Sequence, residues 1–163
     1  MTSSPSLPQS VLSKTLDAKL ISVNAEISSA KKLLEEMARL LTTALDDDVR
    51  EKDIYHLLLE REKLGNTGIG NGVAVPHSRS DQANTAIVAI ISLQQPIDFD
   101  SIDKQEVDLA FGLLVPKEAS QEHLNLLADI ARLVSDPDKK NQLSVAKTPS
   151  EVIALIGSWS NIN

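Results

Sequence analysis

Two stretches of this sequence, residues 86–93 and 107–115, are apolar over most of their length. A strand with one face in water alternates apolar and polar residues, whereas a strand covered on both faces carries a nearly continuous apolar run. Both stretches are long enough for a strand and too short for a helix that crosses a membrane. The sequence therefore predicts a buried sheet with helices packed against both of its faces.

Two helices are predicted before these strands. Residues 29–44 place five apolar side chains on one helical face, namely Leu33, Leu34, Met37, Leu40 and Leu41. A second helix is predicted to follow the acidic run at residues 46–48, with Asp48 and Glu51 at capping-box spacing, and to end at Gly65. Its buried stripe is formed by Ile54, Leu57 and Leu58.

Two further helices are predicted after the strands. Residues 120–134 form the third, and a terminal helix begins at Thr148, with Pro149 at its first position and Glu151 at its third. A short strand at residues 73–75 adds to the two long ones. We therefore predict the α/β class, with a mixed β-sheet and helices on both faces in a single-domain sandwich.

The length of 163 residues fits one domain, which we place at residues 11–160 after a flexible N-terminus of residues 1–10. That terminus has no basic start and no apolar run, so it does not read as a signal peptide. We therefore expect a cytoplasmic protein with no membrane insertion.

The amino-acid composition excludes or disfavours several classes of function. The chain has no cysteine, which excludes a thiolate nucleophile and a cysteine zinc site. Its net charge is −7, and its four aromatic residues offer few stacking platforms. Nucleic-acid binding needs a cationic footprint and usually aromatic side chains, so no nucleic-acid partner is expected.

Four of the six glycines fall between residues 65 and 72. Glycine and asparagine accept positive φ, so this window predicts an irregular, tightly folded loop that includes Gly70, Asn71 and Gly72. The loop either simply connects a helix to a strand or lets a ligand approach its backbone. A dinucleotide fingerprint needs a strand before the glycines, and a Walker loop needs a lysine after them, so both are excluded.

His77 follows the short strand and Pro76, at a strand end where sites often lie. It is either an ordinary surface histidine or a reactive one. Residues 61–80 contain three basic groups (Arg61, Lys63 and Arg79) against one acid, Glu62, a local balance of +2 in an acidic chain. Such a positive island beside amide donors suits an anion.

Two more residues are candidates for the same site. Arg61 falls within the apolar stripe of its helix, so either its stem packs there while its charge reaches water or its guanidinium points to the glycine loop. His123 lies in the first turn of the third helix, where the helix dipole favours the neutral ring. It is either a half-buried helix residue or a partner of His77. His56 is given no role.

Other chemistries fit less well. His77 and His123 could bind zinc, but no HExxH spacing appears and no carboxylate is placed to complete a site, so no metal and no cofactor is expected. A serine hydrolase would need a G-x-S-x-G elbow, which the chain lacks.

Residues 61–77, REKLGNTGIGNGVAVPH, resemble the active-site segment of enzyme IIA domains of the mannitol/fructose class of the bacterial phosphotransferase system, most closely the nitrogen-related branch, IIA(Ntr). Residues 95–100 (QPIDFD), the run from 107 to 116 and His123-Leu124 also fit this family. The resemblance covers most of the chain. It implies an α/β sandwich with a mixed sheet, in agreement with the layers predicted above.

The resemblance further implies a phosphocarrier. His77 would accept a phosphoryl group from a phosphorylated HPr-like protein, His123 would be the second histidine of the site, and Arg61 would line it. Gly70, Asn71, Gly72, Ser78 and Arg79 are expected to support the phosphoryl group. In this branch the domain is thought to regulate target proteins according to its phosphorylation state, with potassium-transport proteins or sensor kinases as candidate targets.

Ser78 departs from the family, which usually has glycine or another very small residue after the active histidine. If that position needs positive φ, serine would be strained by about a kcal/mol or more. If it does not, the hydroxyl could be one more donor. Two alternative functions remain: a sugar-specific IIA component that passes phosphate to a IIB domain, and a binding module that is not phosphorylated.

Overall fold

The computed structural model describes residues 11–118 and 120–160. The predicted flexible terminus, residues 1–10, lies outside this range. The helices are α1 (Val11–Thr15), the 3₁₀ turn η1 (Ala18–Leu20), α2 (Ala30–Thr42), α3 (Glu51–Leu64), α4 (Ser120–Val134), α5 (Pro137–Val145) and α6 (Pro149–Ser160). The strands are β1 (Ile21–Ala25), β2 (Gly68–Gly70), β3 (Val73–Ala74), β4 (His77–Arg79), β5 (Ile87–Ile97) and β6 (Val107–Val115).

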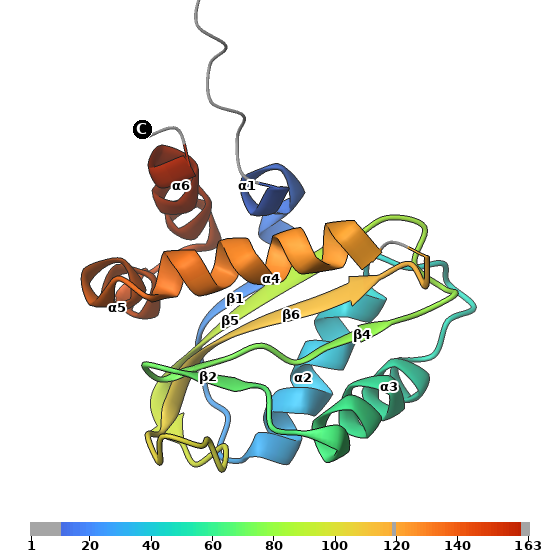
Figure 1. The fold of residues 1–163 in the computed structure, drawn as a ribbon, viewed down its shortest axis with the longest axis horizontal. Coiled ribbons are helices and arrows are strands. Elements are labelled where there is room, and N and C mark those ends of the chain that lie inside the picture. The colour runs from blue at the N-terminus through green and yellow to red at the C-terminus, as the bar shows by residue number, and fades with distance from the viewer. Residues whose placement is uncertain (1–10, 119, 161–163) are drawn as a thin grey trace, which may run out of the picture.

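The strands form one mixed sheet in the order β1-β5-β6-β3-β2, with β4 also paired to β6. The central pair, β5 and β6, is antiparallel, and Ala89 lies opposite Gly112. The pairs β1–β5, β3–β6 and β4–β6 are parallel. Because β3 and β4 follow one another along the same side of β6, the chain from Val73 to Arg79 runs the length of that strand (Figure 1).

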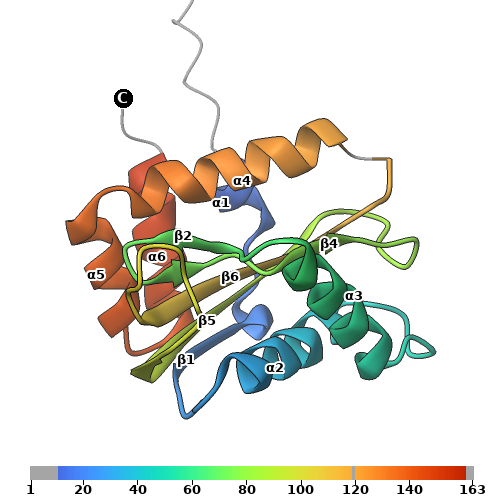
Figure 2. The ribbon, with the colours of Figure 1, turned by 60° about the horizontal axis from the view of Figure 1, so that its bottom comes forward.

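Helices cover both faces of this sheet, as the sequence predicted. Figure 2 shows α2 and α3 on one side and α4 on the other, with α1, α5 and α6 on the side of α4. Alternate residues of β5 point into the two layers: Ala89 and Ile91 into the core beneath α2 and α3, and Val88 and Ile90 into the core beneath α4. Burial on both faces explains why this strand is continuously apolar.

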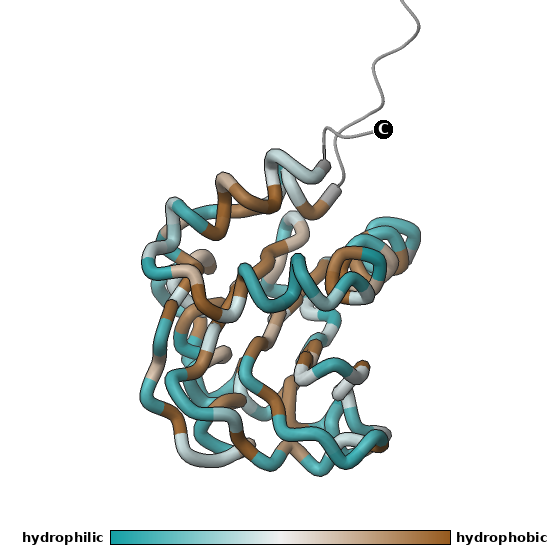
Figure 3. The backbone as a smooth tube through the Cα atoms, turned by 90° about the vertical axis from the view of Figure 1, so that its left-hand side faces the viewer, coloured by the Kyte–Doolittle hydropathy of each residue, from teal (hydrophilic) through white to brown (hydrophobic). Residues whose placement is uncertain are grey.

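The helices bury one face each. In Figure 3 hydrophobic and hydrophilic segments alternate along them, the pattern expected of helices packed on a sheet. The apolar stripe predicted for residues 29–44 is buried on α2, and Met37 at its centre is 0% exposed. The predicted cap of α6 is present, because the Glu151 amide donates to Thr148 Oγ1 over 3.1 Å.

The structure corrects the predicted start of α3. The capping box at Asp48 is absent: the helix begins at Glu51, and its N-cap is Arg50, which makes no side-chain cap hydrogen bond. The helix ends at Gly65 as predicted.

The glycine window is also more regular than predicted. Gly68–Gly70 form strand β2, which pairs antiparallel with β3, and Gly70 lies opposite Val73. The two residues between the strands are Asn71 (φ 58°) and Gly72 (φ 79°). Two consecutive positive φ values define the tight hairpin turn for which Asn-Gly is the preferred sequence. The window is therefore a tight β-hairpin, with an irregularity in the register between Gly68 and Gly70, where Gly70 also has a positive φ of 95°.

Candidate functional site

The backbone fixes His77 at the start of β4. Pro76 ends the preceding segment, and its carbonyl accepts a hydrogen bond of 3.0 Å from the Leu113 amide of β6. His77 then pairs in parallel register with Leu113. The chain on both sides of the histidine is thus tied to the central sheet, which leaves the imidazole half-buried at the surface of a rigid layer.

His123 approaches His77 from the opposite element. It lies in the first turn of α4 and is 8% exposed. The centroids of the two imidazole rings are 5.1 Å apart, and their planes make an angle of 89°. The structure therefore brings together the two histidines that the sequence singled out, and it leaves His56 apart, beside Tyr55.

A backbone hydrogen bond defines the tautomer of His77. Its Nδ1 lies 2.6 Å from the carbonyl oxygen of Val75. A carbonyl can only accept, so Nδ1 must carry the proton of the neutral ring. The lone pair is then on Nε2, and this nitrogen is the nucleophilic atom of the imidazole.

Both histidines are kept neutral. Burial lowers the pKa of His77 from its ordinary value of 6.5, and the nearby charge of Arg61 lowers it further, while the Val75 hydrogen bond and Glu62 act in the opposite direction. Burial likewise lowers the pKa of His123, assisted by His77, Arg79 and Arg61. A neutral ring at pH 7 has a lone pair available for attack.

Arg61 and Arg79 supply positive charge to this pair. Of the two orientations left open for Arg61, the structure has the second: its Nη1 donates to the carbonyl oxygen of Gly65 over 2.7 Å, so the guanidinium points to the glycine window. Arg79 is exposed on β4 and donates to the Lys117 carbonyl over 3.5 Å. Two guanidinium groups near two neutral imidazoles form a site that suits a phosphate-like anion.

The hairpin turn at Gly70, Asn71 and Gly72 is not part of this site. Asn71 donates to the carbonyl of Val134, at the C-terminal end of α4, whereas His123 is at the N-terminal end. Four residues of extended chain separate Gly72 from His77, so the two Cα atoms are up to about 16 Å apart along the strand. The structure thus does not bring these three residues next to the two histidines: Gly72 of the turn lies against the ion pair of Lys140 and Asp108.

Ser78 also differs from expectation. Ser78 does not have a positive φ, so a serine at this position causes no strain from a left-handed backbone conformation. Neighbouring side chains of a strand point to opposite faces, so the Ser78 hydroxyl faces away from the His77 ring. Its Oγ donates to the Arg79 carbonyl over 3.3 Å. Neither the strain nor the extra donor considered for this position is present.

Two residues of the site, Glu62 and Thr67, were missed by the sequence reasoning. Glu62 accepts two hydrogen bonds from Thr67, one from its amide (2.8 Å) and one from its hydroxyl (2.6 Å). A carboxylate in the last turn of a helix opposes the helix dipole. An acidic residue at position 62, three residues before the helix-ending Gly65, could therefore have indicated that its carboxylate has a specific partner beyond the end of the helix.

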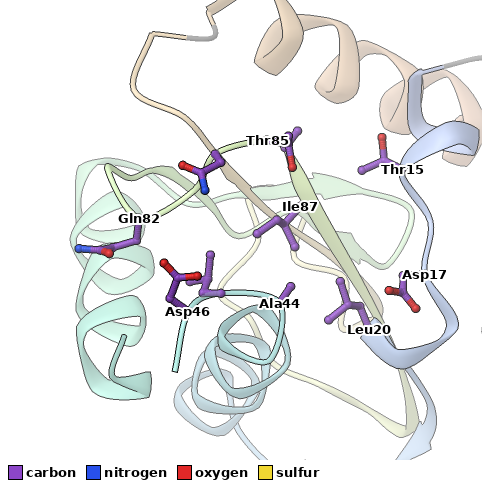
Figure 4. Close-up of a pocket in the computed structure, with 11 residues that line it drawn as sticks. Thr15, Asp17, Leu20, Ala44, Asp46, Gln82, Thr85 and Ile87 are labelled. Atoms are coloured by element: carbon purple, nitrogen blue, oxygen red, sulfur yellow. The ribbon is translucent and has the colours of Figure 1, made fainter. Parts of the chain in front are cut away.

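A separate cavity of about 290 Å³ lies at another edge of the molecule (Figure 4). It is bordered by η1, the end of α2 and the turn before β5, and its lining includes Asp17, Asp46 and Thr85 but neither histidine of the site.

Within residues 11–118 and 120–160, no cluster of three or more His, Cys, Asp or Glu side chains could hold a metal ion. In the same residues no helix is long and apolar enough to span a membrane.

The fold is a mixed α/β sandwich with two adjacent histidines, and comparisons with known proteins identify its family as one of phosphotransferase carriers. The sequence model of the phosphoenolpyruvate-dependent sugar phosphotransferase system, EIIA 2, matches residues 14–159. The chain therefore belongs to this EIIA 2 family, as the sequence resemblance predicted.

Relatives specify the branch. A nitrogen regulatory protein of Pseudomonas aeruginosa is 40% identical over 139 residues, which cover 85% of this chain and 90% of that protein. The crystal structure of the nitrogen regulatory protein IIA-Ntr from Neisseria meningitidis superposes with a TM-score of 0.83 at 35% identity, over 90% of this chain and 99% of that one. The mannitol IIA in a complex of enzyme IIAMTL and phosphorylated enzyme IIBMTL from Escherichia coli has a TM-score of 0.74 at 17% identity, over 88% and 97% of the two chains. The fold class is thereby confirmed, and the relatives from Pseudomonas aeruginosa and Neisseria meningitidis are nitrogen regulatory proteins.

Proposed function

We propose that this protein is a phosphocarrier of the nitrogen-related phosphotransferase system, with its domain at residues 11–160, and that it acts in the cytoplasm. It accepts a phosphoryl group on His77 from a phosphorylated HPr-like protein. The observation that carries the proposal is the hydrogen bond from His77 Nδ1 to the Val75 carbonyl, because it leaves the Nε2 lone pair free for attack. The protein is thus a phosphohistidine carrier rather than a conventional turnover enzyme.

The transfer balances without a cofactor. Nε2 of neutral His77 forms a bond to phosphorus while the bond between phosphorus and the donor breaks, and the bonding electrons return to the donor. The Nδ1 proton stays in place, and the positive charge that develops on the ring is stabilised by the Val75 carbonyl. A phosphorylated imidazole holds its phosphoryl group in a labile P–N bond, so the group can be passed on.

The neighbouring groups have supporting roles. Phosphoryl transfer depends mainly on positioning and on stabilisation of the charged oxygens. Arg61 and Arg79 supply positive charge, and both influence His123 electrostatically. The His123 ring lies with its centroid 5.1 Å from that of His77, which is close enough for it to contact a phosphoryl group on His77.

The regulatory role is supported by the relatives, which are nitrogen regulatory proteins. We propose that target proteins distinguish the phosphorylated from the unphosphorylated form, with potassium-transport proteins or sensor kinases as candidate targets. A second function is favoured by the complex of the mannitol homologue with phosphorylated IIB: a sugar-specific IIA would pass its phosphoryl group to a IIB domain. Direct measurement of transfer to a sugar-specific IIB separates the two.

The decisive test is incubation with a phosphorylated HPr-type carrier, followed by mass spectrometry under non-acidic conditions. The expected result is an acid-labile gain of one phosphoryl group that is absent from His77→Ala. Full labelling of His77→Ala would overturn the assignment of the site. No labelling of the wild-type chain by an active donor would favour a binding module that is not phosphorylated.

A further inference from the structure

A chain of hydrogen bonds connects the end of α3 to the reacting ring. The Glu62 carboxylate accepts from the amide and the hydroxyl of Thr67, over 2.8 and 2.6 Å. The Thr67 carbonyl accepts from the Val75 amide over 2.9 Å. The Val75 carbonyl then accepts from Nδ1 of His77 over 2.6 Å. Each residue in this series is held by the one before it.

Burial makes the series sensitive to its first member. Thr67 is 4% exposed and Val75 is 2% exposed, so water cannot readily replace a lost partner at either residue. Both polar hydrogens of Thr67 go to one carboxylate. Without that carboxylate Thr67 loses both of its side-chain-mediated bonds to α3. Among the hydrogen bonds of the described residues, the segment from Gly65 to Val75 is then held to this helix only through Gly65, by the bonds of its amide to the Glu62 carbonyl and of its carbonyl to Arg61.

We infer that Glu62 is a positioning residue that sets the tautomer of His77. Its carboxylate places Thr67, Thr67 places Val75, and the Val75 carbonyl retains the proton on Nδ1. The lone pair therefore stays on Nε2. The consequence for phosphoryl transfer rests on the proposed function, whereas the consequence for the tautomer does not.

A purely structural role for Glu62 would give a different result. If the carboxylate only stabilised the loop, its loss would lower the melting temperature and leave the tautomer of His77 unchanged. If it acted on His77 only through its charge, Thr67→Val would have no effect, because that substitution keeps the charge and removes one hydrogen bond. The positioning role requires that both substitutions alter the tautomer.

The variants follow from these contacts. Glu62→Gln keeps the size of the side chain but replaces one carboxylate oxygen by an NH2 donor, so only one of the two bonds from Thr67 can still be accepted by an oxygen of its own. Thr67→Val removes the hydroxyl bond alone, and Thr67→Ser retains it. Glu60→Gln is the matched control, since Glu60 lies on the same helix and pairs with the exposed Lys63 over 3.2 Å.

The measurement is ¹⁵N NMR of the imidazole nitrogens of His77 in the unphosphorylated chain, at a pH where the ring is neutral. The wild type, Thr67→Ser and Glu60→Gln should show Nδ1 protonated and Nε2 unprotonated. Glu62→Gln and, to a smaller extent, Thr67→Val should show mixed protonation of the two nitrogens. Wild-type nitrogen shifts in folded Glu62→Gln would overturn the inference; if that variant does not fold, Thr67→Val decides in the same way.

Transfer rates add a second readout. With a phosphorylated HPr-type donor, Glu62→Gln should be labelled more slowly than the wild type, by up to about 100-fold, the loss that a misplacement of about 1 Å can cause. An unchanged rate beside a changed tautomer would overturn the part of the inference that concerns positioning for transfer. If the wild-type chain accepts no phosphoryl group, the proposed function fails, and the NMR result still decides whether Glu62 sets the tautomer.

Discussion

The imidazole rings of His77 and His123 stand almost perpendicular to one another, with centroids 5.1 Å apart, although they come from a strand and from a helix on the other side of a long connection. Each ring buries part of the other, and burial is the main reason why both pKa values are lowered. In the function that we propose, the pair provides one nucleophile, His77, and one neighbouring ring, His123, that contacts a phosphoryl oxygen.

Removal of the second ring should therefore slow transfer without abolishing it. In His123→Ala the nucleophile keeps its Val75 hydrogen bond, while the phosphoryl oxygens lose one neighbour. Loss of one such contact typically costs about 100-fold in rate. Labelling by a phosphorylated HPr-type donor, followed over time, checks this value; His123→Ala that is labelled as slowly as His77→Ala would contradict the division of roles.

Stability should depend on pH through the same two rings. Folding lowers both histidine pKa values below 6.5, so between the folded and unfolded pKa values the unfolded chain binds more protons than the folded one. The free energy of unfolding is therefore unaffected by the titration of these two histidines above pH 6.5. It decreases as the pH drops below that value towards the folded pKa values.

Urea unfolding at a series of pH values between 7.5 and about 5.5 measures this effect above the range in which carboxylates titrate. The double variant His77→Gln, His123→Gln should show a flatter profile over that interval. An equally steep decline in the double variant would mean that other groups are responsible.

Much of the fold follows from the sequence because burial leaves a compositional record. Residues 86–93 and 107–115 are apolar since β5 and β6 are covered on both faces, and Leu33, Met37 and Leu40 recur with helical spacing since one face of α2 is buried. Helix α5 was missed because it has no apolar stripe: of its described side chains, only Lys140 and Leu143 are buried. Its Asp136 N-cap and Pro137 were nevertheless a helix-start signal.

The site was predictable only in part. The sequence was enough to single out His77, His123 and Arg61 as candidates. Their proximity could not be predicted, because it depends on how β4 and α4 meet in the fold. The glycine window shows the opposite case. Its density of glycines left open whether it is a simple connection or a loop that a ligand approaches. Asn71-Gly72 is the local signature of a hairpin turn, and the parallel pairing of β3 and β4 along β6 carries that turn away from the histidines.

Ser78→Gly tests whether serine limits the reaction. Ser78 lies in β4 without positive φ, and its side chain faces away from His77, so glycine should leave the rate of phosphoryl acceptance within about twofold of wild type. Stability should fall by about 0.5 kcal/mol, because glycine weakens a strand. A clear gain in labelling rate would show that the hydroxyl obstructs the phosphoryl donor or the ring.

Two glycines outside the site should respond in opposite directions to alanine. A Cβ on Gly112, in β6, would lie within 3.0 Å of three side-chain atoms of Met37, a residue on the buried face of α2 that is 0% exposed. Gly112→Ala should lower the free energy of unfolding by about 1–3 kcal/mol, the usual range for overpacking a filled core.

A Cβ on Gly157, within α6, would meet no neighbouring atom within 4 Å, so Gly157→Ala should raise stability by about 0.5–1 kcal/mol. Urea unfolding of both variants with equal m-values checks the pair, and a Gly112→Ala protein as stable as wild type would show that the layer between α2 and β6 is looser than the contacts of Met37 indicate.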